Sequence, residues 1–246
     1  PAPAKLVPPT TVMKGDPPGK SGFADLGAKM PKPQPSRPHT PWSPDAKRML
    51  RPCTPAFWKV VLPWFRSSFP NAPDWDEHTL NRLANRVEKG FIRVEADEVT
   101  YNLHVMLRYE IEKQLFNGDL EVDDLPEAWN SMFKSWFDVD VPEDRLGCLQ
   151  DIHWSMGAIG YFPTYTLGNL YCAQFFEKAM ADMPDMYSQF EKGEFSGLLD
   201  WLRTNIHHHG RRYRAGELCE KVTGRPLESA PLVAHLNDKL RPLYGV

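Results

Sequence analysis

Several features that would assign a function are absent from this 246-residue sequence. It has no run of about 18 or more apolar residues, so it predicts no membrane-spanning helix. Its formal net charge of −3 gives no overall basic character, and no nucleic-acid partner is expected. Its four cysteines, Cys53, Cys148, Cys172 and Cys219, form no CxxC pair. We therefore expect neither a zinc ribbon nor a disulfide framework, and we interpret the thiols as reduced.

Residues 1–44 lack glutamate and contain 12 of the 24 prolines, with six Lys or Arg against two Asp. Such a segment cannot bury enough apolar surface to offset its ordering entropy, so an extended proline-rich arm is expected. The arm can dock on its own helical domain or lie across partner subunits, and we favour the partner subunits. Because the sequence does not begin with methionine, we expect that a targeting segment or the initiator methionine was removed.

The remaining chain, residues 45–246, has the apolar spacing of helices and predicts an all-α domain. Pro63 is expected to kink the first helix, Asp124 is a candidate cap, and Pro126 lies in the first turn of its helix. Only residues 91–95 and 120–123 offer brief strands. The helices are expected at about 54–69, 73–90, 96–116, 124–137, 164–182, 184–191, 195–208, 213–222 and 230–241.

One segment places polar side chains at steps of four, four, three and four residues. These steps put the side chains on one helical face if the helix starts early enough. The face is either the wall of a cleft or a solvated surface with internal ion pairs. Its residues are Arg93, Asp97, Tyr101, His104 and Arg108.

The motif "GCLQDIHW", residues 147–154, carries an amide, a carboxylate, an imidazole and an indole. Asp151 and His153 can be read as weak metal ligands, as a carboxylate that orients a histidine, or as part of a structural hydrogen-bonded cluster. Three consecutive histidines, residues 207–209, point about 100° apart on a helix and cannot chelate one ion together. We interpret them as the last turn of a helix that ends before Gly210.

Several motifs together resemble the C-terminal part of the thermostable, Taq-type metallocarboxypeptidases, a family of HExxH zincins. The resemblance begins near "PAFWKVVLPWF" and continues to the C-terminus. "IRVEAD" and "GCLQDIHW" match the IRxxAD and GxxQDxHW signatures of that family. The other matching stretches are "YNLHVMLRYEIEKQL", "DLPEAWN", "GYFPTYTLGNLYCAQ" and "WLRTNIHHHGRRY".

The resemblance implies an all-helical zincin-like fold, usually a homodimer, that removes C-terminal residues from peptides with a divalent metal. In that family two histidines of HExxH and a glutamate of a later HES/GQ motif hold the metal, and the HExxH glutamate is the general base. This sequence contains no HExxH. His39 is followed by Thr40 rather than Glu, and residues 1–38 contain neither His nor Glu. We therefore expect no metal, no cofactor and no catalytic residue.

These observations predict a carboxypeptidase-like pseudoenzyme that serves as an accessory subunit of a large organellar complex, with the mitochondrion favoured. Its expected partners are other protein subunits, contacted by residues 1–44 and by an exposed face that the N-terminal half covers in the family. The alternatives are a carboxypeptidase completed by another chain and a peptide-binding regulatory module in which Arg93 grips a carboxylate. The residues interpreted as a vestigial cleft are Arg93, Asp97, Tyr101, His104, Arg108, Gln150, Asp151, His153, Trp154, Tyr161 and Tyr165.

Overall fold

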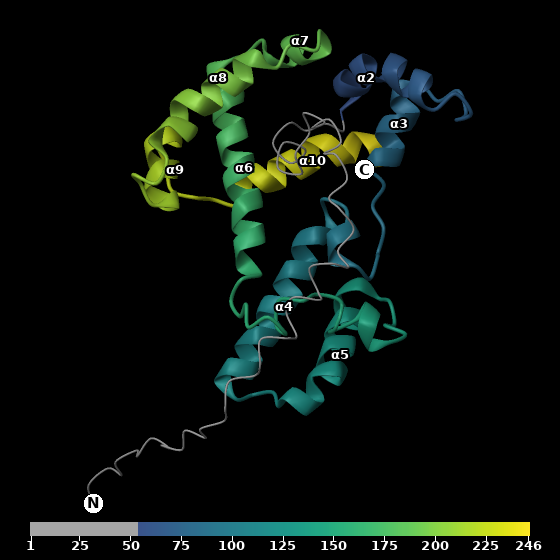
Figure 1. The fold of residues 1–246 in the computed structure, drawn as a ribbon, viewed down its shortest axis with the longest axis vertical. Helices are drawn as coiled ribbons and strands as arrows, with labels where there is room; N and C mark the ends of the chain where they lie inside the picture. The colour runs from purple at the N-terminus through teal and green to yellow at the C-terminus, as the bar shows by residue number, and fades with distance from the viewer. Residues whose placement is uncertain (1–53) are drawn as a thin grey trace, which may run out of the picture. The chain divides into compact units, whose positions relative to one another are not determined.

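The computed structural model describes residues 54–246, and this part of the chain confirms the predicted all-α fold (Figure 1). The arm expected at residues 1–44 and the thiol of Cys53 lie outside the described residues. The α-helices are α2 (Pro55–Ser68), α3 (Glu77–Ala84), α4 (Thr100–Asn117), α5 (Leu125–Phe137), α6 (Pro163–Asp182), α7 (Met186–Glu191), α8 (Ser196–Asn205), α9 (Ala215–Thr223) and α10 (Ala230–Tyr244). Four 3₁₀ turns accompany them: η1 (Arg93–Glu95), η2 (Val122–Asp124), η3 (Asp144–Leu146) and η4 (His207–His209).

The two brief strands expected at residues 91–95 and 120–123 are wrong, because no strand occurs between residues 54 and 246. In both places the backbone forms hydrogen bonds between residues three positions apart. The amide of Glu95 donates to the carbonyl of Ile92 at 3.2 Å, and the amide of Asp124 donates to the carbonyl of Glu121 at 3.1 Å. These local bonds form the 3₁₀ turns η1 and η2, which leave no ladder of free groups for a neighbouring strand.

The helix expected over residues 73–90 is much shorter, since α3 ends at Ala84. Its acidic start is confirmed: Asp76 is the N-cap, and its carboxylate accepts from the amide of Thr79 at 2.7 Å. At the other end the Asn85 side chain donates to the carbonyl of Asn81 at 2.7 Å. An asparagine side chain that bonds to the carbonyl four residues earlier competes with continuation of the helix, so the helix ends well before Gly90.

The first turn of α5 agrees only in part with the prediction. Pro126 lies in that turn as expected, and Asp124 occupies the N-cap position. The Asp124 side chain makes no capping hydrogen bond, because its backbone is already helical in η2. Its carboxylate therefore acts on the helix only through its charge.

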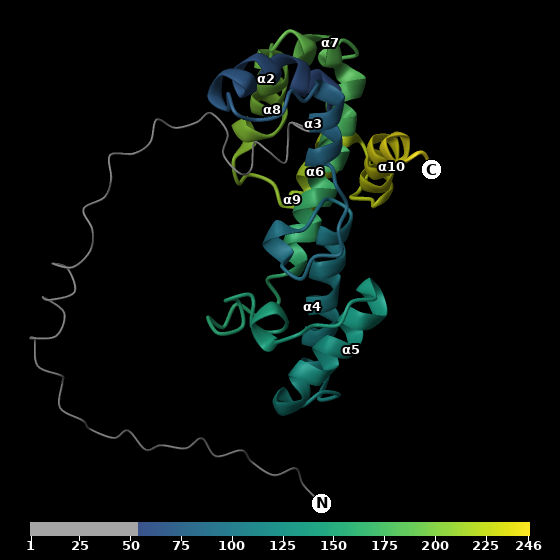
Figure 2. The ribbon, with the colours of Figure 1, turned by 90° about the vertical axis from the view of Figure 1, so that its right-hand side faces the viewer.

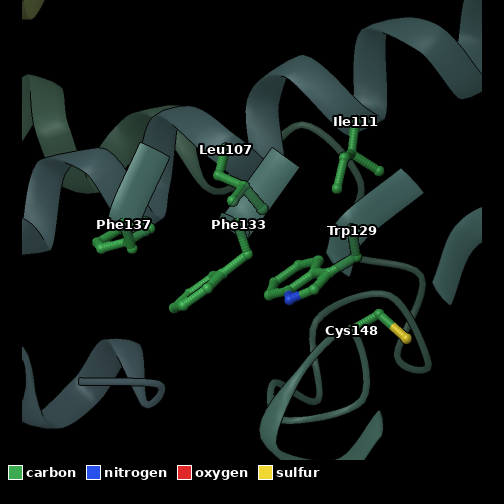
Figure 3. Close-up of a cluster of buried hydrophobic side chains, with 6 residues drawn as sticks. All are labelled: Leu107, Ile111, Trp129, Phe133, Phe137 and Cys148. Carbon is green, nitrogen blue, oxygen red and sulfur yellow. The ribbon is translucent and has the colours of Figure 1, made fainter. Parts of the chain in front are cut away.

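Helices α4 and α5 pack against each other around a core of large side chains (Figure 3). Leu107 and Ile111 of α4 point toward Phe133 and Trp129 of α5, and Cys148 lies beside Trp129. All five are at most 5% exposed. Each fully buried side chain of this size contributes about 1.5–3 kcal/mol to folding. This core fixes the α5–α6 connection, in which Cys148 and the GCLQDIHW motif lie, next to α4 (Figure 2).

Helix α6 connects this core to the rest of the described chain, because it packs against α4, α9 and α10 (Figure 1). Gln174 of α6 is fully buried and donates to the carbonyl of Pro226 at 2.8 Å, while its carbonyl oxygen accepts from the amide of Glu228 at 2.9 Å. A second apolar core joins α6, α7 and α8. None of the helices between residues 54 and 246 is long and apolar enough to cross a bilayer.

Candidate functional site

The centre of the candidate site is one carboxylate held by two arginines. Asp151 accepts two hydrogen bonds from Arg93, from Nη2 at 2.7 Å and from Nε at 3.1 Å. It accepts a third from Nε of Arg108 at 2.8 Å, and Nη2 of Arg108 lies 2.7 Å from the same oxygen. The side chains of Arg93, Arg108 and Asp151 are 5%, 1% and 13% exposed. Both oxygens of the carboxylate are therefore already occupied by guanidinium groups.

Three different elements bring these groups together. Arg93 lies in η1, Arg108 lies in the middle of α4, and Asp151 lies in the α5–α6 connection. The early helix start that the four-residue spacing required is wrong, because α4 begins only at Thr100. The Asp97 carboxylate accepts from the amides of Val99 and Thr100 at 2.9 and 3.0 Å. Asp97 thus ends the preceding loop, and it does not reach the arginine cluster.

Aromatic rings cover the guanidinium groups on the sides that Asp151 does not reach. Cζ of Arg93 is 4.8 Å from the ring centre of Tyr165, and Cζ of Arg108 is 4.7 Å from that of Trp129. Nη1 of Arg93 donates to the Tyr101 hydroxyl at 3.0 Å. Cation–π contacts of this kind strengthen when they are shielded from water. The guanidinium groups of Arg93 and Arg108 therefore belong to the packed interior of the protein.

The pKa values follow from this geometry. Burial opposes the charged form of Asp151, but the hydrogen bonds from Arg93 and the charge of Arg108 outweigh it, so the Asp151 pKa lies below its usual value. Burial lowers the pKa of Arg108 to about 10, against the opposing effect of Asp151. At neutral pH the cluster therefore holds two cations and one anion.

His153 lies at the edge of this cluster rather than in a metal site. Its Nε2 is 3.0 Å from the Tyr165 hydroxyl, and its ring packs on Phe162 with centres 4.4 Å apart. Its Nδ1 is 3.8 Å from Asp151, beyond hydrogen-bond distance. Burial lowers the pKa of His153, despite the nearby carboxylate of Asp151. Asp151 is therefore engaged by the arginines and does not orient His153 through a hydrogen bond.

Gln150 and Trp154 anchor the rest of the motif. The Gln150 side chain accepts from the amide of Arg93 at 2.9 Å and donates to the carbonyl of Phe91 at 3.0 Å. The indole of Trp154 donates to the Glu112 carboxylate at 2.9 Å. The motif thus ties the α5–α6 connection to both η1 and α4.

Two other predicted residues keep their side chains out of the hydrogen bonds of the arginine cluster, although the carbonyl of His104 accepts from Nη1 of Arg108 at 2.7 Å. His104 is fully buried against Phe137, with ring centres 4.7 Å apart, and burial lowers its pKa to about 4. Tyr161 is 50% exposed and packs edge-on against Tyr165. That the eleven residues line a cleft stays a prediction; what the structure describes is mainly a buried polar cluster.

Sequence reasoning missed Glu112, which is 4% exposed and accepts from both the Trp154 indole and the amide of Gly160. A signal was present, because Glu112 lies four residues after Arg108 and continues the polar stripe on α4. It also missed Trp129 and Phe162, whose rings cover Arg108. An apolar residue that covers a buried cation carries no signal in the sequence beyond its size.

The described residues do not fit the divalent metal that the family resemblance implies. Between residues 54 and 246 no group of three or more His, Cys, Asp or Glu side chains is placed to hold an ion. Asp151 is the only carboxylate of the GCLQDIHW motif, and an added cation would meet the charges of Arg93 and Arg108 there. The histidines at 207–209 form the 3₁₀ turn η4, which ends before Gly210 as predicted, although α8 itself already ends at Asn205.

The all-helical fold defines a class of protein when it is compared with solved structures. The M32 carboxypeptidase from Deinococcus radiodurans R1 matches with a TM-score of 0.79 and 39% identity, over 82% of this chain and 42% of that chain. Trypanosoma cruzi metallocarboxypeptidase 1 matches with a TM-score of 0.73 and 35% identity, over 77% and 40% of the two chains. The described fold is that of part of a helical metallocarboxypeptidase.

The family model described as Carboxypeptidase Taq (M32) metallopeptidase matches residues 53–240, and the chain belongs to that family. It is 46% identical over 189 residues to Thermostable carboxypeptidase 1 of Thermus thermophilus, over 77% of this chain and 37% of that protein. It is 40% identical over 163 residues to Carboxypeptidase 1 of Bacillus subtilis, over 66% of this chain and 32% of that protein. The chain thus spans about a third of the length of these two relatives.

Proposed function

We propose that the chain is a non-catalytic, carboxypeptidase-like accessory subunit of a larger protein assembly. One observation carries the proposal: Asp151 of the GCLQDIHW motif is enclosed by Arg93 and Arg108, which use both of its oxygens to join η1, α4 and the α5–α6 connection. A group that serves chemistry must reach the reacting atoms. A group enclosed in this way stabilises the fold instead.

The sequence supports the same conclusion. Peptide hydrolysis requires a polarising metal or an activated nucleophile. These 246 residues contain no HExxH, which supplies two metal ligands and the general base in the family. His153 is held by Tyr165 and Phe162 and has a lowered pKa, but no nucleophile that it would activate lies beside it in the described contacts. The family motifs are here used for packing.

The partners that we propose are other protein subunits of an organellar assembly, with the mitochondrion favoured. The composition of residues 1–44, rich in proline and poor in acidic residues, suits contact with neighbouring subunits. The peptide-binding alternative gains no support from Arg93, because Asp151 and Tyr101 already bind its guanidinium group. An external carboxylate would first have to displace Asp151.

Sedimentation of native extracts together with metal analysis tests the proposal. We expect the chain in fractions of large particles, with far less than one equivalent of zinc, cobalt or manganese per chain. The matched comparison is an extract made after the particle has been dissociated with salt, in which the chain should move to light fractions. A free monomer in untreated extract, or one bound metal per chain, would overturn the proposal.

A further inference from the structure

Between Leu149 and Tyr161, the connection from α5 to α6 bonds several polar side chains to the interior and leaves five large apolar side chains exposed. Inward, Gln150 bonds to η1, Asp151 bonds to both arginines, and Trp154 bonds to Glu112. The exposed apolar residues lie on the same segment. They are Leu149 (69% exposed), Ile152 (67%), Met156 (71%), Ile159 (45%) and Tyr161 (50%).

In an ordinary surface loop most of the exposed side chains are polar. The hydrogen bonds of Gln150, Asp151 and Trp154 fix the path of the backbone, so the exposed apolar side chains extend from a rigid segment. Val94, 70% exposed, adds to them, because it follows Arg93, whose amide donates to Gln150 at 2.9 Å. We call these six exposed residues, Val94 and the five outward residues of the connection, the motif-loop surface. Several large apolar side chains exposed on one fixed segment are typical of an interaction site.

The charges around the motif-loop surface indicate the chemistry of its partner. No lysine or arginine occurs from residue 146 to residue 177, and the carboxylate of Asp151 is the only charge between residues 145 and 177. Glu95 follows Val94, and Asp144 accepts the amide of Leu149 on its carbonyl at 2.9 Å. Both carboxylates are exposed and make no ion pair within residues 54–246. Arg145, next to Asp144, is also exposed but pairs with Glu143. The unpaired charges beside the surface are thus the carboxylates of Glu95 and Asp144, which we call its acidic rim.

We propose that the motif-loop surface docks a protein subunit whose contact face is apolar and bordered by lysine or arginine. This inference rests on the proposed accessory role and names the surface that serves it. An acidic rim complements a basic one and repels a bilayer of anionic lipids. The fixed backbone lowers the entropy lost on binding, because the apolar groups are already in place.

Two double variants of matched exposure test the proposal in the native assembly. Ile152→Ser with Met156→Ser removes two outward side chains of the surface, and Phe116→Ser with Val122→Ser removes two that are 70% and 72% exposed near the α4–α5 connection. We expect the first variant to lower the fraction of chain that co-sediments with the assembly by about tenfold, and the second to leave it unchanged. Circular dichroism of both purified variants should match the wild type, because all four side chains are largely exposed.

The rim is tested by Glu95→Lys, which should lower the co-sedimenting fraction more strongly at low salt than at high salt. Equal co-sedimentation of the loop variant and the wild type would overturn the inference while leaving the accessory role intact. A wild-type chain that never co-sediments would overturn the accessory role itself. If the pure chain forms dimers that Ile152→Ser with Met156→Ser abolishes, the occupant is a second copy. If the chain floats with phosphatidylcholine vesicles and the same variant does not, the occupant is a lipid. Either result would overturn the proposed partner.

Discussion

Replacing Asp151 by asparagine tests the arginine cluster directly. The substitution keeps the size of the side chain and removes the single negative charge between Arg93 and Arg108, whose side chains are 5% and 1% exposed. Two cations would then remain side by side in the interior without a counter-charge. Removing one partner of a buried ion pair costs about 3–5 kcal/mol. A domain of this kind has about 5–15 kcal/mol of total stability, so a large share would be lost.

The assay is urea unfolding of the purified chain, followed by circular dichroism of the helices. With an m-value of about 2 kcal/mol/M, Asp151→Asn should lower the midpoint by about 2 M. The matched control is Asp200→Asn, which breaks an ion pair with Arg203 whose side chains are 71% and 63% exposed. That pair is worth about 0–1 kcal/mol, so its midpoint should barely move. Equal midpoints for the two variants would refute the conclusion that Asp151 stabilises the fold through Arg93 and Arg108.

Two further predictions concern protonation and a buried amide. Burial lowers the pKa of His104 from 6.5 to about 4. Between these pH values the imidazole is neutral in the folded chain and takes up a proton when the chain unfolds. The free energy of unfolding should therefore fall as the pH decreases from about 6.5 to 4. His104→Leu should make urea midpoints over that range depend less on pH; an unchanged dependence would show that His104 does not titrate as described. Gln174→Leu should leave the carbonyl of Pro226 and the amide of Glu228 without their partner, at a cost of about 1–3 kcal/mol. Hydrogen exchange at the Glu228 amide should accelerate, and unchanged protection would contradict the role of Gln174.

Helical periodicity predicted the α-helices of residues 54–246, but it placed several of their ends incorrectly. Asp97 and Asn85 explain two of the errors. Both residues use their side chains to bond nearby backbone, at the start of α4 and the end of α3. In the sequence, an Asp or Asn at such a position is compatible both with the polar face of a continuing helix and with the end of a helix. Only the cap geometry separates the two outcomes.

The spacing of polar residues correctly predicted that Arg93 and Arg108 lie close together, but it attributed this to a shared helical face. They meet through Asp151, a residue more than 40 positions along the chain, and not through a shared helix. The sequence named all three residues because each stands in a family motif. It could not show that the carboxylate faces two arginines, or that Trp129 and Phe162 shield one of them, because those contacts arise from the packing of α4, α5 and the connection to α6.

We propose that this chain contributes structure and no peptidase chemistry of its own. The most direct test is release of C-terminal amino acids from blocked dipeptides by the purified 246-residue chain supplied with zinc or cobalt, with and without a chelator. The account predicts no release above that of the metal alone, and the same result for the Asp151→Asn variant. Release that the wild-type chain supports and that the chelator abolishes would contradict the account.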